Sequence, residues 1–400
     1  MSVRPSLLEY ESRLNRPLMM KIPELQVNER LKHVIFARQF SKVTLQRLFD
    51  LADKIRNISQ SKPGCDYLTS LLSHKRAMLY FTQQSTRTFL SFMAACQILG
   101  MRVNEIRDPS LSSEYKGEDP LDSVRMFSTY FDLIIMRSKI PNFAECCAYL
   151  MNDLDHFHMK TVPIVSGGAG ADEHPTQALL DIYTIDRLFS FTASPNSPRV
   201  DWFNKLKVKY PDLTKGLDGK HYCFCGDIGR GRTVRSLCQL LALYDNITIT
   251  FVCPDHPKLI PGSDLLSFLS SHRVTVNQTD TLDDVLGKTD LLYMTRIQKE
   301  HDSQNDAGSY KEEDMEKCRL NLDRVARMKD FAGILHPFPR NEEIPMDIDR
   351  DPRALYFTQA RNGMWMRAAL IAYLFDVDSR IDAFHQKTFS EYHDYNVGVL

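Results

Sequence analysis

Short apolar runs of strand character alternate with longer runs of helical spacing through most of this chain. Between residues 76 and 189, the runs RAMLYF, RVNEI, LIIMR and VPIVSG are each followed by a helical pattern. The alternation resumes at HYCFCGD, which starts at residue 221, and ends with FAGILHPF at residue 338. This order of elements predicts an α/β fold with mostly parallel sheets flanked by helices. In such sheets, ligands bind beyond the carboxyl ends of the strands.

The chain is long enough for two domains of this kind, because 400 residues exceed what one ordinary hydrophobic core holds. Prolines, serines and lysines interrupt the alternation at 190–217, which we interpret as a surface insertion or a long loop. We expect an N-terminal extension or helix at 1–35. A first domain is expected at 36–173, completed by a C-terminal helical segment at 362–400, and a second domain at 174–361.

The charge balance gives no reason to expect a polyanionic partner. With 50 basic and 51 acidic side chains, the chain has no global field that favours nucleic acid or an anionic membrane. No apolar stretch approaches the roughly 20 residues that span a bilayer, and the first residues lack a secretory-signal pattern. The nine cysteines lack the CxxC spacing of zinc or redox sites, so we expect no metal. These features predict a cytoplasmic protein.

The stretch YFTQQSTRTFLSF, residues 80–92, joins a short strand directly to a helix. Ser85, Thr86 and Thr88 are expected at the helix N-terminus, where backbone N–H groups and the positive end of the helix dipole also point. Arg87 adds a planar cation that can bind two phosphate oxygens. An ordinary N-cap is the alternative interpretation. The combination predicts a binding site for an oxyanion.

Two further motifs place polar side chains at expected strand or helix ends. Arg137 ends the strand LIIMR, where it could bind an anion or pair with a surface carboxylate. Pro175 suits the first position of a helix, so His174 before it is expected at the helix N-terminus. The positive dipole end disfavours an imidazolium there and favours a neutral ring that donates one hydrogen bond. Gln177 follows one turn later.

The motifs STRT, KGE, HPTQALLD, TRIQKE and HPFPR follow one another along residues 36–376 and resemble those of the aspartate and ornithine carbamoyltransferase family. The resemblance implies that 36–173 binds carbamoyl phosphate and that 174–361 binds aspartate, with the active site in the cleft between them. It implies transfer of the carbamoyl group from carbamoyl phosphate to L-aspartate in de novo pyrimidine biosynthesis, without a metal or organic cofactor.

The resemblance also assigns residues to the two substrates. Those matching the carbamoyl-phosphate site are Ser85, Thr86, Arg87, Thr88, Arg137, His174, Gln177 and Phe338, of which Arg87, Thr88, Arg137 and His174 are the catalytic set. Those matching the aspartate site are Arg232, Arg296 and Gln298. Two guanidiniums suit a dicarboxylic acceptor better than ornithine. GDIGRGRT around Arg232 lacks the GxGxxG order of a dinucleotide site.

Ser112 and Lys116 match a loop that enters the active site of a neighbouring subunit in this family. The resemblance therefore implies a homotrimer with shared active sites, and it leaves room for a regulatory or pathway partner.

The chain departs from the family pattern at several positions. Gln83 replaces a glutamate that pairs with arginines across the cleft, Phe89 and His301 replace arginines, and Asp119 replaces a threonine after KGE. Two alternatives stay open on the sequence. The chain could be an enzyme of the same fold with another amino-acid or amine acceptor, or a non-catalytic binding or scaffold protein.

Overall fold

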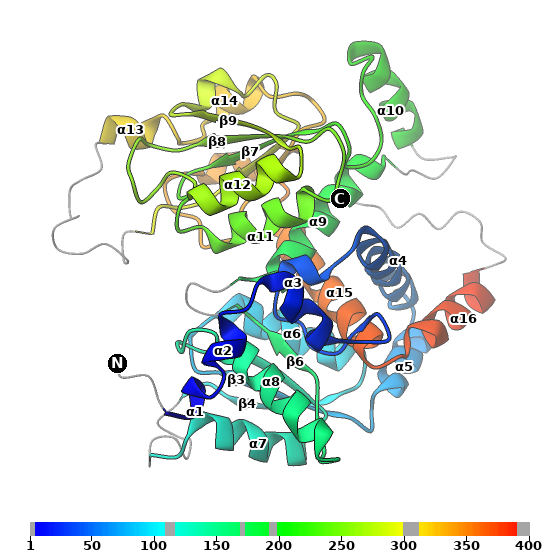
Figure 1. Cartoon of the computed structure of the whole chain (residues 1–400). Coiled ribbons are helices and arrows are strands. Elements are labelled where there is room, and N and C mark those ends of the chain that lie inside the picture. The colour runs from blue at the N-terminus through cyan, green and yellow to red at the C-terminus, as the bar shows by residue number, and fades with distance from the viewer. Residues whose placement is uncertain (1–4, 109–116, 169–172, 192–197, 299–311, 390–400) are drawn as a thin grey trace. The chain divides into compact units, whose positions relative to one another are not determined.

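The computed structural model describes residues 5–108, 117–168, 173–191, 198–298 and 312–389 (Figure 1). The chain divides into two compact units. Unit 1 comprises residues 1–179 and 363–393, and unit 2 comprises residues 180–362 and 394–400. Two of the boundaries fall inside helices: α9 (Pro175–Ser190) leads from unit 1 into unit 2, and α15 (Tyr356–Leu374) leads back.

Unit 1 is built on a parallel sheet with the strand order β4-β3-β5-β6. The strands are β3 (Arg76–Phe81), β4 (Arg102–Ile106), β5 (Leu133–Arg137) and β6 (Ile164–Ser166). The central strands β3 and β5 are buried almost throughout, as expected where helices cover both faces of a parallel sheet. The predicted α/β fold with a parallel sheet is confirmed here.

Some helices of unit 1 begin at polar residues that cap them. The Ser41 hydroxyl accepts a hydrogen bond from the Thr44 N–H at the start of α4, and Asp119 accepts one from the Leu121 N–H at the start of α7. Asp119 therefore has a local role at the position where it departs from the family pattern. The longer helices are α4 (Lys42–Ile58), α5 (Lys62–Leu71), α6 (Thr86–Ile98), α7 (Pro120–Tyr130), α8 (Phe143–His156) and α16 (Asp378–Phe389).

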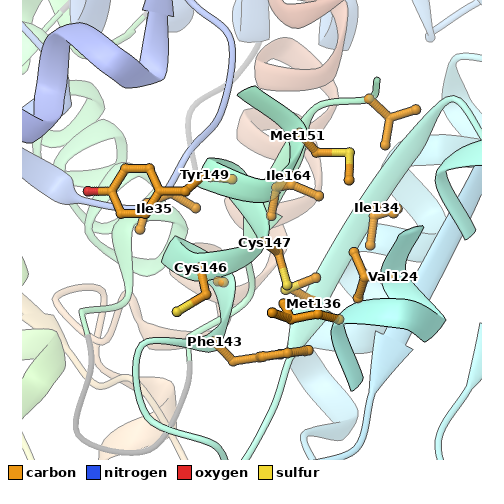
Figure 2. Close-up of a cluster of buried hydrophobic side chains, with 14 of the residues drawn as sticks. Ile35, Val124, Ile134, Met136, Phe143, Cys146, Cys147, Tyr149, Met151 and Ile164 are labelled. Carbon is orange, nitrogen blue, oxygen red and sulfur yellow. The ribbon is translucent and has the colours of Figure 1, made fainter. Parts of the chain in front are cut away.

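The helices α7 and α8 cover one face of this sheet (Figure 2). Side chains alternate between the two faces of a strand, so Met136 and Ile134 of β5 lie on the same face. They meet Val124 of α7 and Cys147 of α8 in a continuous apolar core. This packing fixes the sheet beneath the loops at its carboxyl edge.

The N-terminal segment of unit 1 is anchored on α8 by buried charges. The Lys21 ammonium lies 2.8 Å from the Glu145 carboxylate, and both side chains are at most one-tenth exposed. The Arg13 guanidinium lies 4.2 Å from the centre of the Tyr149 ring and 2.8 Å from Asp153. The segment therefore belongs to the fold of unit 1. Its elements, with the short helix that follows it, are α1 (Pro5–Leu8), α2 (Glu11–Leu14), α3 (Leu18–Lys21), η1 (Ile22–Leu25), β1 (Gln26–Val27), β2 (Arg30–Leu31) and η2 (Ala37–Gln39).

Unit 2 is built on a second parallel sheet, with the order β11-β10-β7-β8-β9. Its strands are β7 (His221–Cys225), β8 (Thr248–Val252), β9 (Thr275–Thr279), β10 (Leu291–Met294) and β11 (Gly333–Leu335). Tyr293 of β10 and Phe224 of β7 point to the same face, with ring centres 5.5 Å apart. The other helices of unit 2 are α11 (Arg232–Leu241), α12 (Ser263–Ser271), η5 (Leu282–Asp284), α13 (Glu312–Glu316), α14 (Leu322–Ala326) and η7 (Met346–Arg350).

The structure corrects two predictions about helical segments. The segment 190–217 is not a long loop throughout, because it forms α10 (Pro198–Lys209). Phe203 of this helix contacts Phe191 at a ring-centre distance of 4.9 Å, and Leu206 is buried. At the C-terminus, α15 begins before residue 362 and a separate helix, α16, follows it.

No helix in the described part of the chain is long and apolar enough to cross a membrane. All nine cysteines are free thiols, and all but Cys65 are buried.

Candidate active site

The Ser-Thr-Arg-Thr step lies at the junction of β3 and α6, as the sequence predicts. Ser85 is the residue before the helix, and the N–H groups of the first turn have no carbonyl partner inside an α-helix. Among the described residues, the Ser85 hydroxyl makes no capping hydrogen bond to its own helix. Thr86 and Arg87 are exposed, whereas Thr88 is buried. This arrangement disfavours the ordinary N-cap and presents hydroxyls and N–H groups to an anion.

Arg137 lies beside this junction at the carboxyl edge of the sheet. It is paired in register with Phe81, the last residue of β3, and its carbonyl accepts a hydrogen bond from the Gln83 N–H at 3.1 Å. The buried Arg137 guanidinium donates to the Gly167 carbonyl at 3.1 Å. The cation is thereby held between the loops that follow β3 and β6.

His174 is 4% exposed and immediately precedes α9, as predicted. Its Nδ1 accepts a hydrogen bond from the Gln177 backbone N–H at 3.3 Å. In the neutral ring, the proton therefore lies on Nε2, which can donate to a substrate oxygen. The same N–H also donates to the His174 backbone carbonyl at 3.0 Å, so the imidazole and this carbonyl share the capping of the first turn.

Gly168 lies against the face of the His174 ring and has a φ of +80°. A Cβ at this position would lie 2.6 Å from Cδ2 and 2.8 Å from Cγ of the imidazole. The glycine is therefore needed both for its backbone conformation and for the close approach. The sequence shows a glycine-rich stretch here, but this contact identifies which glycine positions the histidine.

The predicted aspartate-binding residues lie in unit 2, on loops that follow neighbouring strands. Arg232 is the first residue of α11, after β7, whereas Arg296 and Gln298 follow β10. The two strands are paired in register, with Cys225 opposite Met294. The three side chains are partly exposed. Both guanidiniums therefore belong to the carboxyl edge of one sheet.

Asp227 is completely buried and connects the loops that follow β7 and β10 through hydrogen bonds. Its carboxylate accepts hydrogen bonds from the Arg230 side chain at 2.9 Å and from the Gln298 backbone N–H at 3.1 Å. The Asp227 N–H donates to the Thr295 hydroxyl at 2.9 Å. Sequence reasoning missed this role, although Asp227 directly follows Gly226 at the end of an apolar strand. Gly226 has a φ of +111°, and a Cβ there would lie 2.1 Å from the Thr295 carbonyl oxygen.

Phe338 lies in the loop after β11, which is braced by His336. The Phe338 N–H donates to Nδ1 of His336 at 2.8 Å, and Nε2 of His336 lies 2.9 Å from the Glu343 carboxylate. Burial alone would raise the pKa of Glu343, but hydrogen bonds from His336 and the Asn341 backbone lower it below its ordinary value. The Phe338 ring contacts Tyr356, with ring centres 5.9 Å apart.

Two family models match the chain. The aspartate/ornithine carbamoyltransferase carbamoyl-P binding domain matches residues 32–187, and the Asp/Orn binding domain of the same enzymes matches residues 218–374. This chain belongs to the aspartate/ornithine carbamoyltransferase family. The family prediction from the sequence motifs is therefore confirmed.

Relatives within the carbamoyltransferase family cover most of the chain. Aspartate carbamoyltransferase 1, chloroplastic, of Pisum sativum is 35% identical over 86% of this chain and 78% of its own length. The aspartate carbamoyltransferase catalytic subunit of Methanosarcina barkeri is 33% identical over 85% of this chain and 96% of its own length.

Solved carbamoyltransferase structures share the two-unit architecture. The aspartate transcarbamoylase of Trypanosoma cruzi in complex with carbamoyl phosphate matches with a TM-score of 0.70 and 31% identity, over 87% of this chain and 98% of that chain. The catalytic subunit of M. jannaschii aspartate transcarbamoylase matches with a TM-score of 0.69 and 29% identity, over 87% of this chain and 99% of that chain.

The predicted site residues fall into two groups. Unit 1 brings together the residues from Ser85 to Thr88, Arg137 and His174, with Gln177 one turn into α9, whereas unit 2 carries Arg232, Arg296, Gln298 and Phe338. Ser112, Lys116 and His301 lie outside the described residues. The described part of the chain contains no cluster of three or more His, Cys, Asp or Glu side chains that could hold a metal.

Proposed function

We propose that this chain transfers the carbamoyl group of carbamoyl phosphate to L-aspartate, giving N-carbamoyl-L-aspartate and phosphate. One observation carries the proposal: each of the two family domains retains its own anion-binding edge. Unit 1 has a helix N-terminus flanked by hydroxyls and arginines, and unit 2 has two arginines after neighbouring strands. A phosphate and a dicarboxylic amino acid match these two edges in charge.

In unit 1, the reaction requires a site for the phosphate and, next to it, a site for the carbamoyl carbonyl. Ser85, Thr86 and Arg87 bind the phosphate through hydroxyls, helix N–H groups and the guanidinium. Thr88, Arg137 and His174 hydrogen-bond the carbamoyl oxygen as negative charge develops on it. One such donor contributes on the order of 10² to 10³ in rate. Gln177 binds the carbamoyl nitrogen. Phe338, which the family motif also assigns to carbamoyl phosphate, belongs to unit 2.

In unit 2, Arg232 and Arg296 bind the two carboxylates of L-aspartate, and Gln298 orients the amine. Fixing the amine relative to the carbonyl lowers the entropic part of the barrier. The lone pair of the α-amine attacks the carbamoyl carbon, forming the C–N bond while the bond from carbon to the phosphate oxygen breaks. The departing phosphate accepts the proton that the amine loses, so the reaction needs no side chain as a general base.

The experiment is an assay of the purified protein for carbamoyl-aspartate formation, with ornithine and other amines as alternative acceptors. Arg87→Ala should reduce turnover at least about 100-fold without unfolding the protein, because this exposed cation serves the phosphate and not the core. Arg102→Ala is the matched control, since Arg102 is an exposed arginine at the start of β4. If the wild type is active only with another amine, that amine and not aspartate is the acceptor. Full activity of Arg87→Ala would refute the phosphate assignment.

We further propose a homotrimer that acts in de novo pyrimidine biosynthesis in the cytoplasm, with Ser112 and Lys116 completing a neighbouring subunit's site. The support is the sequence match of this loop to the family motif. Mixing inactive Lys116→Ala and His174→Ala subunits should restore part of the activity, because some interfaces then combine two intact halves. Failure to recover activity after verified subunit exchange would exclude shared sites.

A further inference from the structure

Asp181 is a completely buried carboxylate that the reaction above does not use. It lies in the part of α9 that belongs to unit 2. One of its oxygens accepts a hydrogen bond from the Tyr293 hydroxyl at 2.8 Å, and the other accepts one from the Gln359 side-chain amide at 2.6 Å. A buried carboxylate is costly unless it is satisfied in this way, so these two bonds hold three segments in one arrangement.

Each partner of Asp181 is close in sequence to a proposed substrate residue. Tyr293 lies on β10, three residues before Arg296. Gln359 uses its carbonyl oxygen to accept the backbone N–H of His336 at 2.9 Å, and His336 braces the loop of Phe338. The network therefore connects α9 to two of the loops at the edge of the unit 2 sheet.

A third connection runs to α11. The side chain of Thr233, the residue after Arg232, hydrogen-bonds to Tyr293. Burial and the nearby Asp181 raise the pKa of Tyr293 well above its ordinary value, so its hydroxyl keeps the proton that it donates to Asp181. Tyr293 thus receives one hydrogen bond and donates another. The segments of Arg232, Arg296 and Phe338 are all one or two hydrogen bonds from the same carboxylate.

A carboxylate matches the two donors that face it. The Tyr293 hydroxyl and the Gln359 amide both donate to Asp181, and a carboxylate offers two acceptor oxygens without a donor. Asparagine, which has the same shape, could accept from Gln359 but would turn its amide N–H toward Tyr293. The Tyr293 hydroxyl would then have to accept that bond and turn its own proton toward Thr233, so the direction of the hydrogen bonds through Tyr293 depends on the carboxylate.

We propose that Asp181 is a positioning residue for the acceptor: it sets the segments of Arg232, Arg296 and Phe338 through Tyr293 and Gln359 and thereby determines the affinity for L-aspartate. This inference rests on the proposed function, since it concerns the site assigned there to aspartate. Asp181 does not touch the substrate in this scheme. Its effect should therefore fall mainly on the acceptor, through the segments of Arg232 and Arg296, and less on carbamoyl phosphate, through the Phe338 loop.

The test compares Asp181→Asn with a control on the same two helices. Thr184 of α9 accepts a hydrogen bond from the Asn362 amide of α15 at 3.0 Å, and both residues are buried. Thr184→Val removes this bond and the one that the Thr184 hydroxyl donates to the Leu180 carbonyl, at nearly constant volume, and neither bond has a partner on β10 or on the Phe338 loop. We expect Asp181→Asn to raise the aspartate KM about tenfold, equivalent to about 1.4 kcal/mol, with the carbamoyl phosphate KM within twofold of wild type. Thr184→Val should leave both constants within twofold.

Tyr293→Phe provides a second variant in case Asp181→Asn does not fold, because it removes one hydroxyl and keeps the ring. It should also raise the aspartate KM. In the double variant the two effects should not add, since both act on the same hydrogen bond. The positioning role would be overturned if Asp181→Asn and Thr184→Val changed the aspartate KM equally. It would also be overturned if Asp181→Asn changed the KM values of both substrates equally.

Hydrogen exchange separates this inference from the proposed reaction. Whether or not the wild type forms carbamoyl-aspartate, Asp181→Asn should speed amide exchange at 295–298 and 336–340, and Thr184→Val should not. Faster exchange with an inactive wild type would retain the network and refute the function. Unchanged exchange in these segments with an active wild type would refute the network alone.

Discussion

We expect Gly168→Ala to inactivate the enzyme by displacing the imidazole ring of His174. A Cβ on Gly168 would lie 2.6 Å from Cδ2 of His174, whereas an ordinary van der Waals contact begins at 3.4 Å, so the imidazole must retreat by about 0.8 Å. A misplacement of about 1 Å at a reacting group can cost about 100-fold in rate. We therefore expect kcat for carbamoyl-aspartate formation to fall about 100-fold, equivalent to about 2.7 kcal/mol in the barrier.

The positive φ of Gly168 also makes alanine unfavourable for the backbone, by about 1 to 2 kcal/mol. Gly216 separates the two effects, because its φ is +83° and no atom of the described residues lies within 4 Å of a Cβ built there. Gly216→Ala should lose similar stability in urea unfolding but keep its kcat. In a His174→Ala background, Gly168→Ala should lower kcat less than about threefold further, since the ring it displaces is gone. A further loss of about 100-fold in that background would refute the displacement argument.

Three other substitutions test separate parts of the site. His174→Ala should lower kcat by about 10² to 10³ and change the aspartate KM little, because its hydrogen bond strengthens in the transition state; an effect on KM alone would indicate a binding role. Gln83→Glu should lower the aspartate KM about fivefold or more without changing carbamoyl phosphate affinity, if the family's carboxylate supports closure; an unchanged or higher KM would remove that argument. Glu343 has a folded pKa below its ordinary value of 4.5, so its stabilisation is present above pH 4.5 and is lost as the pH falls through the folded pKa. Glu343→Gln should therefore show a lower free energy of unfolding near pH 7 and a weaker acid dependence below pH 4.5, and parallel pH curves would contradict this.

The strands of both sheets could be predicted from the sequence because their positions are coded locally. RAMLYF and LIIMR are short, mostly apolar runs, and they form β3 and β5 with those bounds. The position of His174 at the start of α9 was also predictable, since Pro175 suits the first helical turn. The family motifs then identified the substrates.

The parts that could not be predicted depend on contacts between distant residues. Tyr293 lies in an apolar strand and is indistinguishable there from a core residue, whereas its hydrogen bond goes to a carboxylate 112 residues away. Asp227 was passed over because its distant partner, Gln298, is recognisable only when β7 and β10 are neighbours. The helix α10 was missed because the segment 190–217 that contains it has three prolines and three serines, a composition typical of loops.

The N-terminal segment lies before the residues that the family model matches, but it stabilises the unit that they form. The family match begins at residue 32, yet the Lys21 ammonium lies against a Glu145 carboxylate that is only 4% exposed. A chain shortened to the family boundary would keep the carboxylate and lose its cation, a change that typically costs about 3 to 5 kcal/mol in a buried pair. Residues before the start of the family match thus stabilise a helix inside it. The matched domain and the unit that folds have different first residues.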